Sequence, residues 1–318
     1  MQVVAHHEVG EERIAQALEG IEDRAWARWH SMRYGSFSPA GLREFADELL
    51  DHVAARALQD PALDDTARSA LLTAAECHLG LMSLACWPDG DQELRFPLAL
   101  NQTLTSEEMC FRDVVDEPPS ARTWLDVFAV SLVGGLMADW QKVVGLLLRG
   151  DCAPEIHKGA PYSRFTPPED PGGTAAMDAL CFYLAESSGH LPRDWPTVTL
   201  RKPDAEERAE AARLLDAAGE LTADQRLLRV LLDDDRAAFE QALAARLVEH
   251  RESVGADPAP RTLLPMDTLA LAALAVQVHG WEPGISSVYL PQALLGTTDA
   301  LQRAAESGEN NLGVWHAK

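Results

Sequence analysis

The stretch SPAGLREFADELLDHVAARALQDP, residues 38–61, carries the pattern that decides the fold class. Leu42, Phe45 and Leu49 recur at spacings of three and four residues, which places them on one face of an α-helix. A Ser-Pro pair opens the stretch and favours a helix start, whereas the Asp-Pro pair at its end favours a stop, because the residue before a proline disfavours helix. We therefore expect an amphipathic helix between these two dipeptides.

The stretch that follows, LDDTARSALLTAAECHLGLMSLACW at residues 63–87, predicts a second helix. It begins with Asp and Thr residues that are candidate caps, and it continues with small apolar side chains. Only a short Asp-Pro turn separates it from the first helix. Such a short connection predicts an antiparallel helix pair.

Residues 89–104, DGDQELRFPLALNQTL, change character. The Asp-Gly pair at the start is a turn signal, and the residues after it alternate loosely between polar and apolar. Pro97 limits this segment to an edge strand or an extended connector. We expect at most a small β element near 91–104.

Helical periodicity dominates the rest of the chain. Residues 120–150 predict a long apolar helix or a helix pair broken at the Gly-Gly dipeptide 134–135. Proline-rich connectors are expected at 151–173 and 192–203. Further helical patterns are TAAMDALCFYLAES (174–187), DAEERAEAARLLDAAG (204–219), TADQRLLRVLLDDDRAAFEQALAARLVEHRES (222–253) and PMDTLALAALAVQVHGW (265–281).

These patterns predict an all-α fold in which helix pairs pack as a bundle or a short superhelix. The expected organisation is a single helical domain over residues 1–318. An alternative is two sub-halves, 1–150 and 174–318, joined by the proline-rich connector 151–173.

The charge of the chain restricts its partners. Its 318 residues include 27 Lys and Arg and 50 Asp and Glu, which gives a formal net charge of −23. Such a surface repels nucleic acid and anionic membranes, so we expect neither as a direct ligand. A basic partner protein is the natural complement. The alternative is that the acidity only keeps an Ala- and Leu-rich helical protein soluble.

Three features favour a cytoplasmic protein. The first residues, MQVVAHHEVGEERIAQALEG, lack the basic and apolar pattern of a secretory signal. The most apolar stretches, 127–138 and 269–278, are shorter than the roughly 20 residues needed to cross a bilayer. The five cysteines form no CxxC pair and are odd in number, which suits reduced thiols.

Three consecutive acids, Asp233, Asp234 and Asp235, raise the question of a metal site. A magnesium site on a helix needs carboxylates one turn apart, whereas adjacent residues point in different directions. Ala237 and Ala238 stand where the missing ligand would be needed. At a helix start the acids would instead face the positive end of the helix dipole and cap free N–H groups. We therefore expect a helix start rather than a metal site.

No other motif indicates an enzyme, and we expect no cofactor. The His-His-Glu run at residues 6–8 lacks the spacing of zinc hydrolases, and the chain contains no HExxH. His78 lies in an apolar helical stretch and is expected to pack in the core, whereas His250 near a helix end is favourable there when protonated. No GxGxxG, GxxxxGK[ST] or GxSxG stretch is present.

Trp281 and Glu282 form a candidate contact site for a partner. Gly280 is expected to end the preceding helix, and the Pro-Gly pair at 283–284 forms a turn that leaves the indole partly exposed. Exposed aromatic residues beside acids often anchor protein interfaces. Capping of the core is the alternative role for this tryptophan.

Taken in order, several stretches resemble the immunity protein 49 family, predicted immunity proteins of bacterial polymorphic-toxin systems. The final Tyr-Leu-Pro followed by Leu-Leu at 289–295 is the most telling part of the resemblance, and residues 151–222 contribute nothing to it. The stretches are AARALQDP (54–61), ARSALLTAAECHLGLMSLA (67–85), RTWLDVFAVSLVGG (122–135), DDDRAAFEQALAARLVEH (233–250) and LALAALAVQVHGWEPGISSVYLPQALL (269–295).

The resemblance implies a non-enzymatic, mostly helical cytoplasmic protein that binds and neutralises a cognate toxin. The net charge would suit a basic toxin domain, for example a nuclease. Two alternatives remain: a helical adaptor for another protein, and a metal-dependent helical enzyme. The candidate contacts to a toxin are Asp233, Asp234, Asp235, Trp281 and Glu282.

Overall fold

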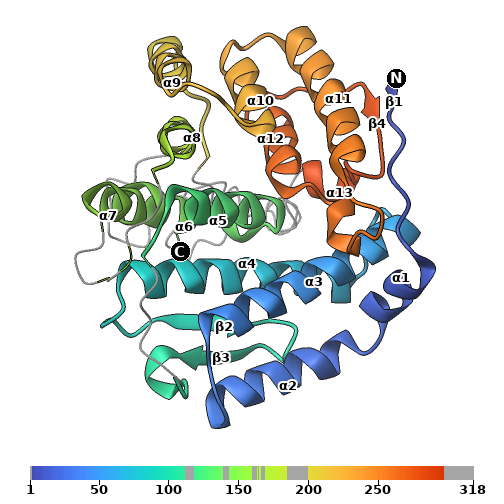
Figure 1. Ribbon diagram of the computed structural model, residues 1–318, viewed down its shortest axis with the longest axis vertical. Helices are drawn as coiled ribbons and strands as arrows, with labels where there is room; N and C mark the ends of the chain where they lie inside the picture. Colours follow the sequence, from blue (N-terminus) through green and yellow to red (C-terminus); the bar gives the residue numbers. More distant parts are fainter. Residues whose placement is uncertain are drawn as a thin grey trace, which may run out of the picture.

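A computed structural model shows a largely helical protein (Figure 1). It describes residues 2–111, 118–138, 143–159, 163, 165, 169–184 and 200–296. The two long helices α3 (Pro39–Gln59) and α4 (Asp65–Cys86) cross the middle of the view. The all-α fold predicted from the periodicity is confirmed.

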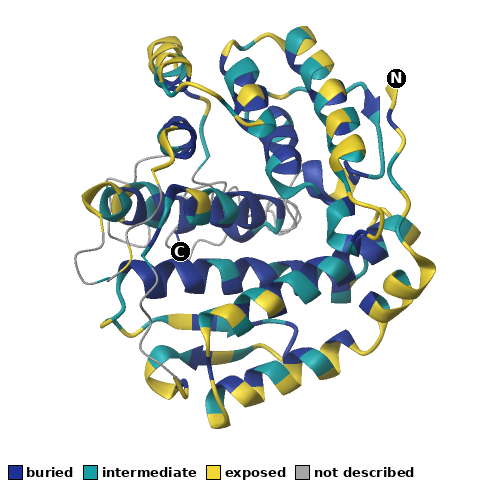
Figure 2. Cartoon of the chain, viewed as in Figure 1, coloured by how far each residue is buried: buried dark blue, intermediate teal, exposed yellow. Residues whose placement is uncertain are grey.

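The pair of α3 and α4 forms as the sequence predicts. The Ser38 side chain accepts a hydrogen bond from the Gly41 N–H at 3.1 Å and so caps the start of α3. Asp64 caps α4 in the same way, accepting from the Ala67 N–H at 2.8 Å. Each cap satisfies an N–H group that has no partner inside the helix. The apolar stripe of α3 is buried against α4, which is itself buried along most of its length (Figure 2).

Helix α4 is long and apolar enough to cross a membrane, judged by length and composition alone. In the structure, 83% of its most apolar window is buried inside the protein. Packing in the core therefore accounts for its apolar character.

The small β element is a hairpin rather than a single edge strand. Strands β2 (Glu93–Phe96) and β3 (Gln102–Thr105) pair antiparallel, with Leu94 opposite Leu104. Pro97 comes directly after β2 and so needs no N–H partner in the ladder. A Cβ at Gly80 of α4 would lie 2.6 Å from the Leu94 side chain, so only glycine lets the hairpin approach this closely.

A second pair of strands lies where the sequence did not predict one. Strand β1 (Gln2–Val3) pairs in parallel with β4 (Ile285–Ser286). The helices α1 (Glu11–Leu18) and α2 (Ile21–Tyr34), which are separated by Gly20 with φ +54°, were also not predicted from the sequence. These helices lie along the outside of α3 (Figure 1).

The apolar stretch at 120–150 is broken at its glycines, which was one of the two alternatives for this segment. Helix α5 (Ala121–Val133) ends at the Gly-Gly dipeptide, and Gly135 has φ +78°. The expected connector at 151–173 is only partly correct, because its first residues continue a π-helical turn (Leu147–Cys152) into α7 (Ala153–Lys158). Much of the second expected connector, 192–203, lies outside the described residues.

The last helices pack onto α5, and α12 makes the main contact. One cluster of buried apolar side chains runs from Val4 to Leu295 through both proposed sub-halves. The division of the chain into domains stays a prediction. The remaining elements are η1 (Ser106–Glu108), η2 (Leu136–Ala138), α6 (Val144–Leu146), α8 (Pro171–Cys181), α9 (Ala205–Ala217), α10 (Ala223–Leu232), α11 (Arg236–Ser253), η5 (Pro260–Leu263), α12 (Met266–Gln277) and α13 (Gln292–Leu295).

Candidate functional site

The three consecutive aspartates form the link between α10 and α11, and only one of them starts a helix. Asp233 ends α10 and forms an ion pair with Arg229 at 2.5 Å. Asp234 has φ +59°, the left-handed conformation that turns the chain. Asp235 caps α11 by accepting from the N–H groups of two alanines at 2.9 and 3.1 Å. The expectation that all three begin a helix is therefore corrected to Asp235 alone.

Asp234 is directed toward side chains from distant parts of the chain. Its carboxylate lies 2.7 Å from Lys202 Nζ, 3.3 Å from the Arg208 guanidinium and 2.9 Å from His279 Nδ1. Burial acts to raise the pKa of Asp234, but the hydrogen bonds from Lys202 and His279 outweigh it, so the net pKa lies below its ordinary value. Asp234 is thus an ionised group whose charge is already compensated.

His279 continues this network into the protein. Its side chain is fully buried, and Nε2 lies 3.0 Å from the hydroxyl of Tyr183, which is also buried. Burial lowers the pKa of His279 and outweighs the opposite effect of Asp234, so the ring is neutral at pH 7. A neutral ring fits the contacts if Nδ1–H donates to Asp234 and Nε2 accepts from Tyr183. With no exposed imidazole atom, this chain of groups is suited to holding α8, α10 and α12 together rather than to catalysis.

The other two predicted contacts differ in exposure. Trp281 is half-buried, as expected, with its ring centroid 4.5 Å from that of His279 and 5.7 Å from that of Phe239. Glu282 is exposed, and its carbonyl accepts a hydrogen bond from Arg236 at 2.6 Å. The structure therefore brings the five predicted residues into one region but turns Asp234 and Trp281 toward the protein itself.

Sequence reasoning missed the partners of Asp234. Lys202 lies in a segment interpreted as a connector, and Arg208 lies in a helix with no recognised motif. The whole of α10 lies between these two residues and Asp234 in the sequence, so no local spacing could have paired them. The left-handed conformation of Asp234 could not be read from the sequence either, because the only sequence indication is that Asp adopts this conformation more readily than most residues.

A second histidine cluster joins the two ends of the described chain. His7 Nδ1 lies 2.7 Å from the Tyr289 hydroxyl, and His7 Nε2 lies 2.8 Å from Thr262 Oγ1. His250 Nε2 contacts the Thr262 carbonyl at 2.8 Å, so it meets a backbone group rather than acting only through a helix dipole. Burial lowers the pKa of both histidines. In the described part of the chain, no group of three or more His, Cys, Asp or Glu side chains is arranged to hold a metal ion.

The remaining thiol and imidazole groups differ in exposure: Cys77 is buried, whereas Cys110 and His30 are exposed. His78 stands within α4, and burial lowers its pKa to about 4, in line with a core histidine. The five cysteines are all free thiols. Burial raises the pKa of Cys77 above its ordinary value, which disfavours the reactive thiolate.

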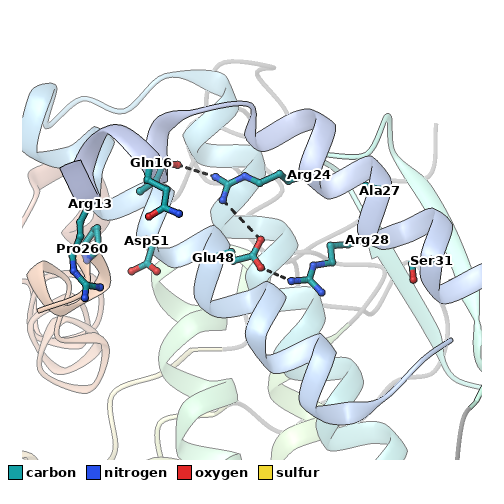
Figure 3. A pocket seen from close by; sticks show the side chains of 10 residues that line it. Arg13, Gln16, Arg24, Ala27, Arg28, Ser31, Glu48, Asp51 and Pro260 are labelled. Carbon is teal, nitrogen blue, oxygen red and sulfur yellow. Dashed lines mark hydrogen bonds and ion pairs between the residues drawn. The ribbon is translucent and has the colours of Figure 1, made fainter. Parts of the chain in front are cut away.

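A groove of about 520 Å³ lies between α1, α2 and α3 (Figure 3). Its arginines are held by carboxylates of the chain: Arg24 and Arg28 both meet Glu48, and Arg13 pairs with Asp257. The groove runs along one flank of α2, and the pairs that Arg24 and Arg28 form with Glu48 connect α2 to α3 there. Its lining residues are Arg13, Gln16, Ala17, Arg24, Ala27, Arg28, Ser31, Glu48, Asp51 and Pro260.

Comparison with known proteins identifies the family. No curated protein and no solved structure matches the chain. The family model described as immunity protein 49 matches residues 60–294, from the turn between α3 and α4 to α13, and it spans the region 151–222 that carried no recognised resemblance. The chain therefore belongs to the immunity protein 49 family.

Proposed function

We propose that this chain neutralises a bacterial toxin by binding its toxin domain directly, without catalysis, in the cytoplasm. Membership of the immunity protein 49 family is the observation that carries the proposal. The arrangement of these polar groups supports it, because Asp234, His279 and Tyr183 are hydrogen-bonded to one another and Asp234 is also paired with Lys202 and Arg208.

The partner that we propose is a basic domain of a polymorphic toxin, for example a nuclease. The net charge of −23 supports this chemistry, because opposite charges accelerate encounter and disfavour wrong partners. The same charge argues against nucleic acid or an anionic membrane as a direct ligand. Asp233, Asp234, Asp235, Trp281 and Glu282 stay candidate contacts, and the exposed Asp233, Asp235 and Glu282 are the members able to meet a partner without rearrangement.

The test begins with the neighbouring gene, which we expect to encode the toxin domain. Co-expression of this chain should restore growth to a host that produces the toxin domain. Surface-plasmon kinetics with the two purified proteins should show an association rate that falls steeply as salt is raised from about 50 to about 300 mM, as expected for steered encounter. Absence of both protection and binding would reject the proposal for this pair. Stoichiometric metal in the purified chain, together with turnover, would favour the metal-dependent enzyme instead.

A further inference from the structure

The outer face of α2 carries a cluster of exposed aromatic side chains. Trp26 is 42% exposed and Tyr34 is 63% exposed. Phe111, at 37%, lies in the segment whose backbone is hydrogen-bonded to the end of α2 through Cys110 N–H and Met32 O at 2.9 Å. Single exposed apolar residues are normal on a protein surface, but a cluster of them marks an interaction site.

These side chains are held in place before any partner arrives. Trp26 stacks on the buried Trp29, with ring centroids 4.9 Å apart. The Arg33 guanidinium lies 5.6 Å from the Trp29 ring and 5.5 Å from the Tyr34 ring, and it pairs with Glu108 at 2.9 Å. Ordering side chains on binding costs conformational entropy, so a preformed aromatic face is suited to anchoring a partner.

The groove of Figure 3 leaves α2 standing as a ridge. Helical geometry places Arg24, Ala27 and Ser31 along the groove and Trp26 on the opposite flank, whereas Tyr34 projects into solvent between the two. A ridge of this kind is reached from outside without moving any other helix.

The charges at the start of α2 indicate which partner fits. Glu19, Glu22 and Asp23 are exposed, and among the described residues none of them forms an ion pair with Lys or Arg. Glu22 accepts a hydrogen bond only from Thr66, at 3.1 Å. The nearby arginines are already paired with carboxylates of the chain, so this end of the ridge carries uncompensated negative charge.

We propose that the outer face of α2 is the surface on which the toxin domain docks, an inference that rests on the proposed function. Lysines and arginines of a basic domain would pair with the three free carboxylates and stack on Trp26 and Tyr34 through cation–π contacts. The family match begins at residue 60, so α2 lies outside the part of the chain that the family model covers. A surface outside the shared region can differ between members and so select one toxin.

The experiment measures binding of the immobilised toxin domain from the neighbouring gene to variants of the full chain. Trp26→Ala and Tyr34→Ala should each weaken binding at least tenfold, mainly through faster dissociation. Asp23→Lys should slow association severalfold. Phe165→Ala, an aromatic residue that is 61% exposed elsewhere, and Glu206→Lys, an exposed acid in the first turn of α9, are matched controls expected to stay within twofold of wild type.

The outcomes separate the docking surface from the function. If wild type binds and all α2 variants bind equally well, the docking surface is overturned while the proposed function stands. If wild type does not bind, both are overturned for this pair. Tyr34→Ala and Asp23→Lys alter exposed residues and should keep the wild-type melting temperature, so lost binding in these variants reports the surface itself. Loss of a concentration-dependent dimer in Tyr34→Ala, with toxin binding unchanged, would assign the face to self-association instead.

Discussion

Two tryptophans of this protein stand beside acidic residues, and their surroundings are opposite. At the α10–α11 link, Lys202 and Arg208 neutralise Asp234, and the nearby Trp281 packs onto the core. At the start of α2, no cation of the described chain pairs with the acids, and Trp26 faces solvent. Figure 1 places the two regions at opposite ends of the molecule, with α10 and α11 at one end and α2 at the other.

The difference teaches that distant cations, rather than local composition, decide whether an acidic cluster is free to bind a partner. Both clusters combine an aromatic residue with two or three carboxylates, but Trp26 follows Asp23 by three positions, whereas the fold brings Trp281 to Asp233–Asp235 from a distant part of the sequence. Only the fold determines that the first one holds helices together. The second one keeps its charge available for a partner.

The largest effect that we expect is on stability at the α10–α11 link. His279→Ala removes a fully buried side chain and leaves Tyr183 and Asp234 without their shared partner. We expect the free energy of unfolding to fall by about 2–4 kcal/mol. Denaturant unfolding measures it, and His30→Ala on the exposed face of α2 is the control, expected to change stability by less than about 0.5 kcal/mol. A loss below about 1 kcal/mol in His279→Ala would contradict the structural role of this cluster.

Next in size is the effect of the two tryptophans on toxin binding. Trp26→Ala should cost roughly 2 kcal/mol of binding free energy, which corresponds to about a 30-fold faster dissociation. Trp281→Ala should mainly lower the melting temperature, because its ring packs on Phe239 and His279. Kinetics at a temperature where both variants are folded separate the two effects. A larger loss of binding in Trp281→Ala than in Trp26→Ala would reverse the comparison and move the interface to the α10–α11 link.

The pH dependence of stability provides a third and smaller contrast. The folded-state pKa of His279 lies below its ordinary value of 6.5, so the unfolded chain takes up a proton more readily. The contribution of His279 to the free energy of unfolding is fully present above about pH 6.5 and is lost as the pH falls toward the folded-state pKa, because protonation favours the unfolded chain. Each tenfold difference in proton affinity between the two states corresponds to about 1.4 kcal/mol. Unfolding measured between pH 7.5 and 5 should therefore give a flatter profile for His279→Gln than for wild type. Tyr34→Phe on α2 should keep the wild-type slope, and identical slopes in all three proteins would count against the assignment.

The smallest effects concern the exposed acids of the link. Asp233→Asn breaks a partly exposed ion pair with Arg229 and should change stability by less than about 1 kcal/mol. If the toxin docks at the α10–α11 link instead of α2, Asp233→Asn and Glu282→Gln should slow association at low salt and leave dissociation unchanged. Unchanged association for both variants would remove these residues from the candidate contacts.

The sequence predicted the parts of the fold that depend on local pattern. The spacing of Leu42, Phe45 and Leu49 and the Asp-Pro stop were sufficient for α3, because a helix is defined by neighbours three and four residues apart. The hairpin was anticipated only as an edge strand or an extended connector, since its second strand contains no strong alternation. Helix α2 has a buried stripe of Ile21, Ala25, Trp29 and Met32, but it was missed because exposed aromatic residues such as Trp26 obscure that stripe in the sequence.

The candidate site was predictable only in part, for a different reason. The acids and Trp281 were each recognised as candidates because they flank helix ends that could be placed from the sequence, but the sequence did not predict that they lie in one region. The partners of Asp234 come from residues 202, 208 and 279, and only tertiary packing brings them together. The sequence therefore located the acidic residues but not the side chains that pair with them.

The pairing of β1 with β4 has a consequence for how the chain is made. Gln2 lies beside Ile285, and the His7 backbone N–H donates to the Tyr289 hydroxyl across 282 positions of sequence. Domains begin to fold while the ribosome is still adding residues, but these contacts cannot form until nearly the whole described chain has emerged. Residues 2–7 are thus synthesised long before they can reach their native place. Closure of this strand pair must wait for strand β4, and a pulse-labelling experiment on nascent chains should find residues 2–7 protected only after residues 285–289 have emerged from the ribosome.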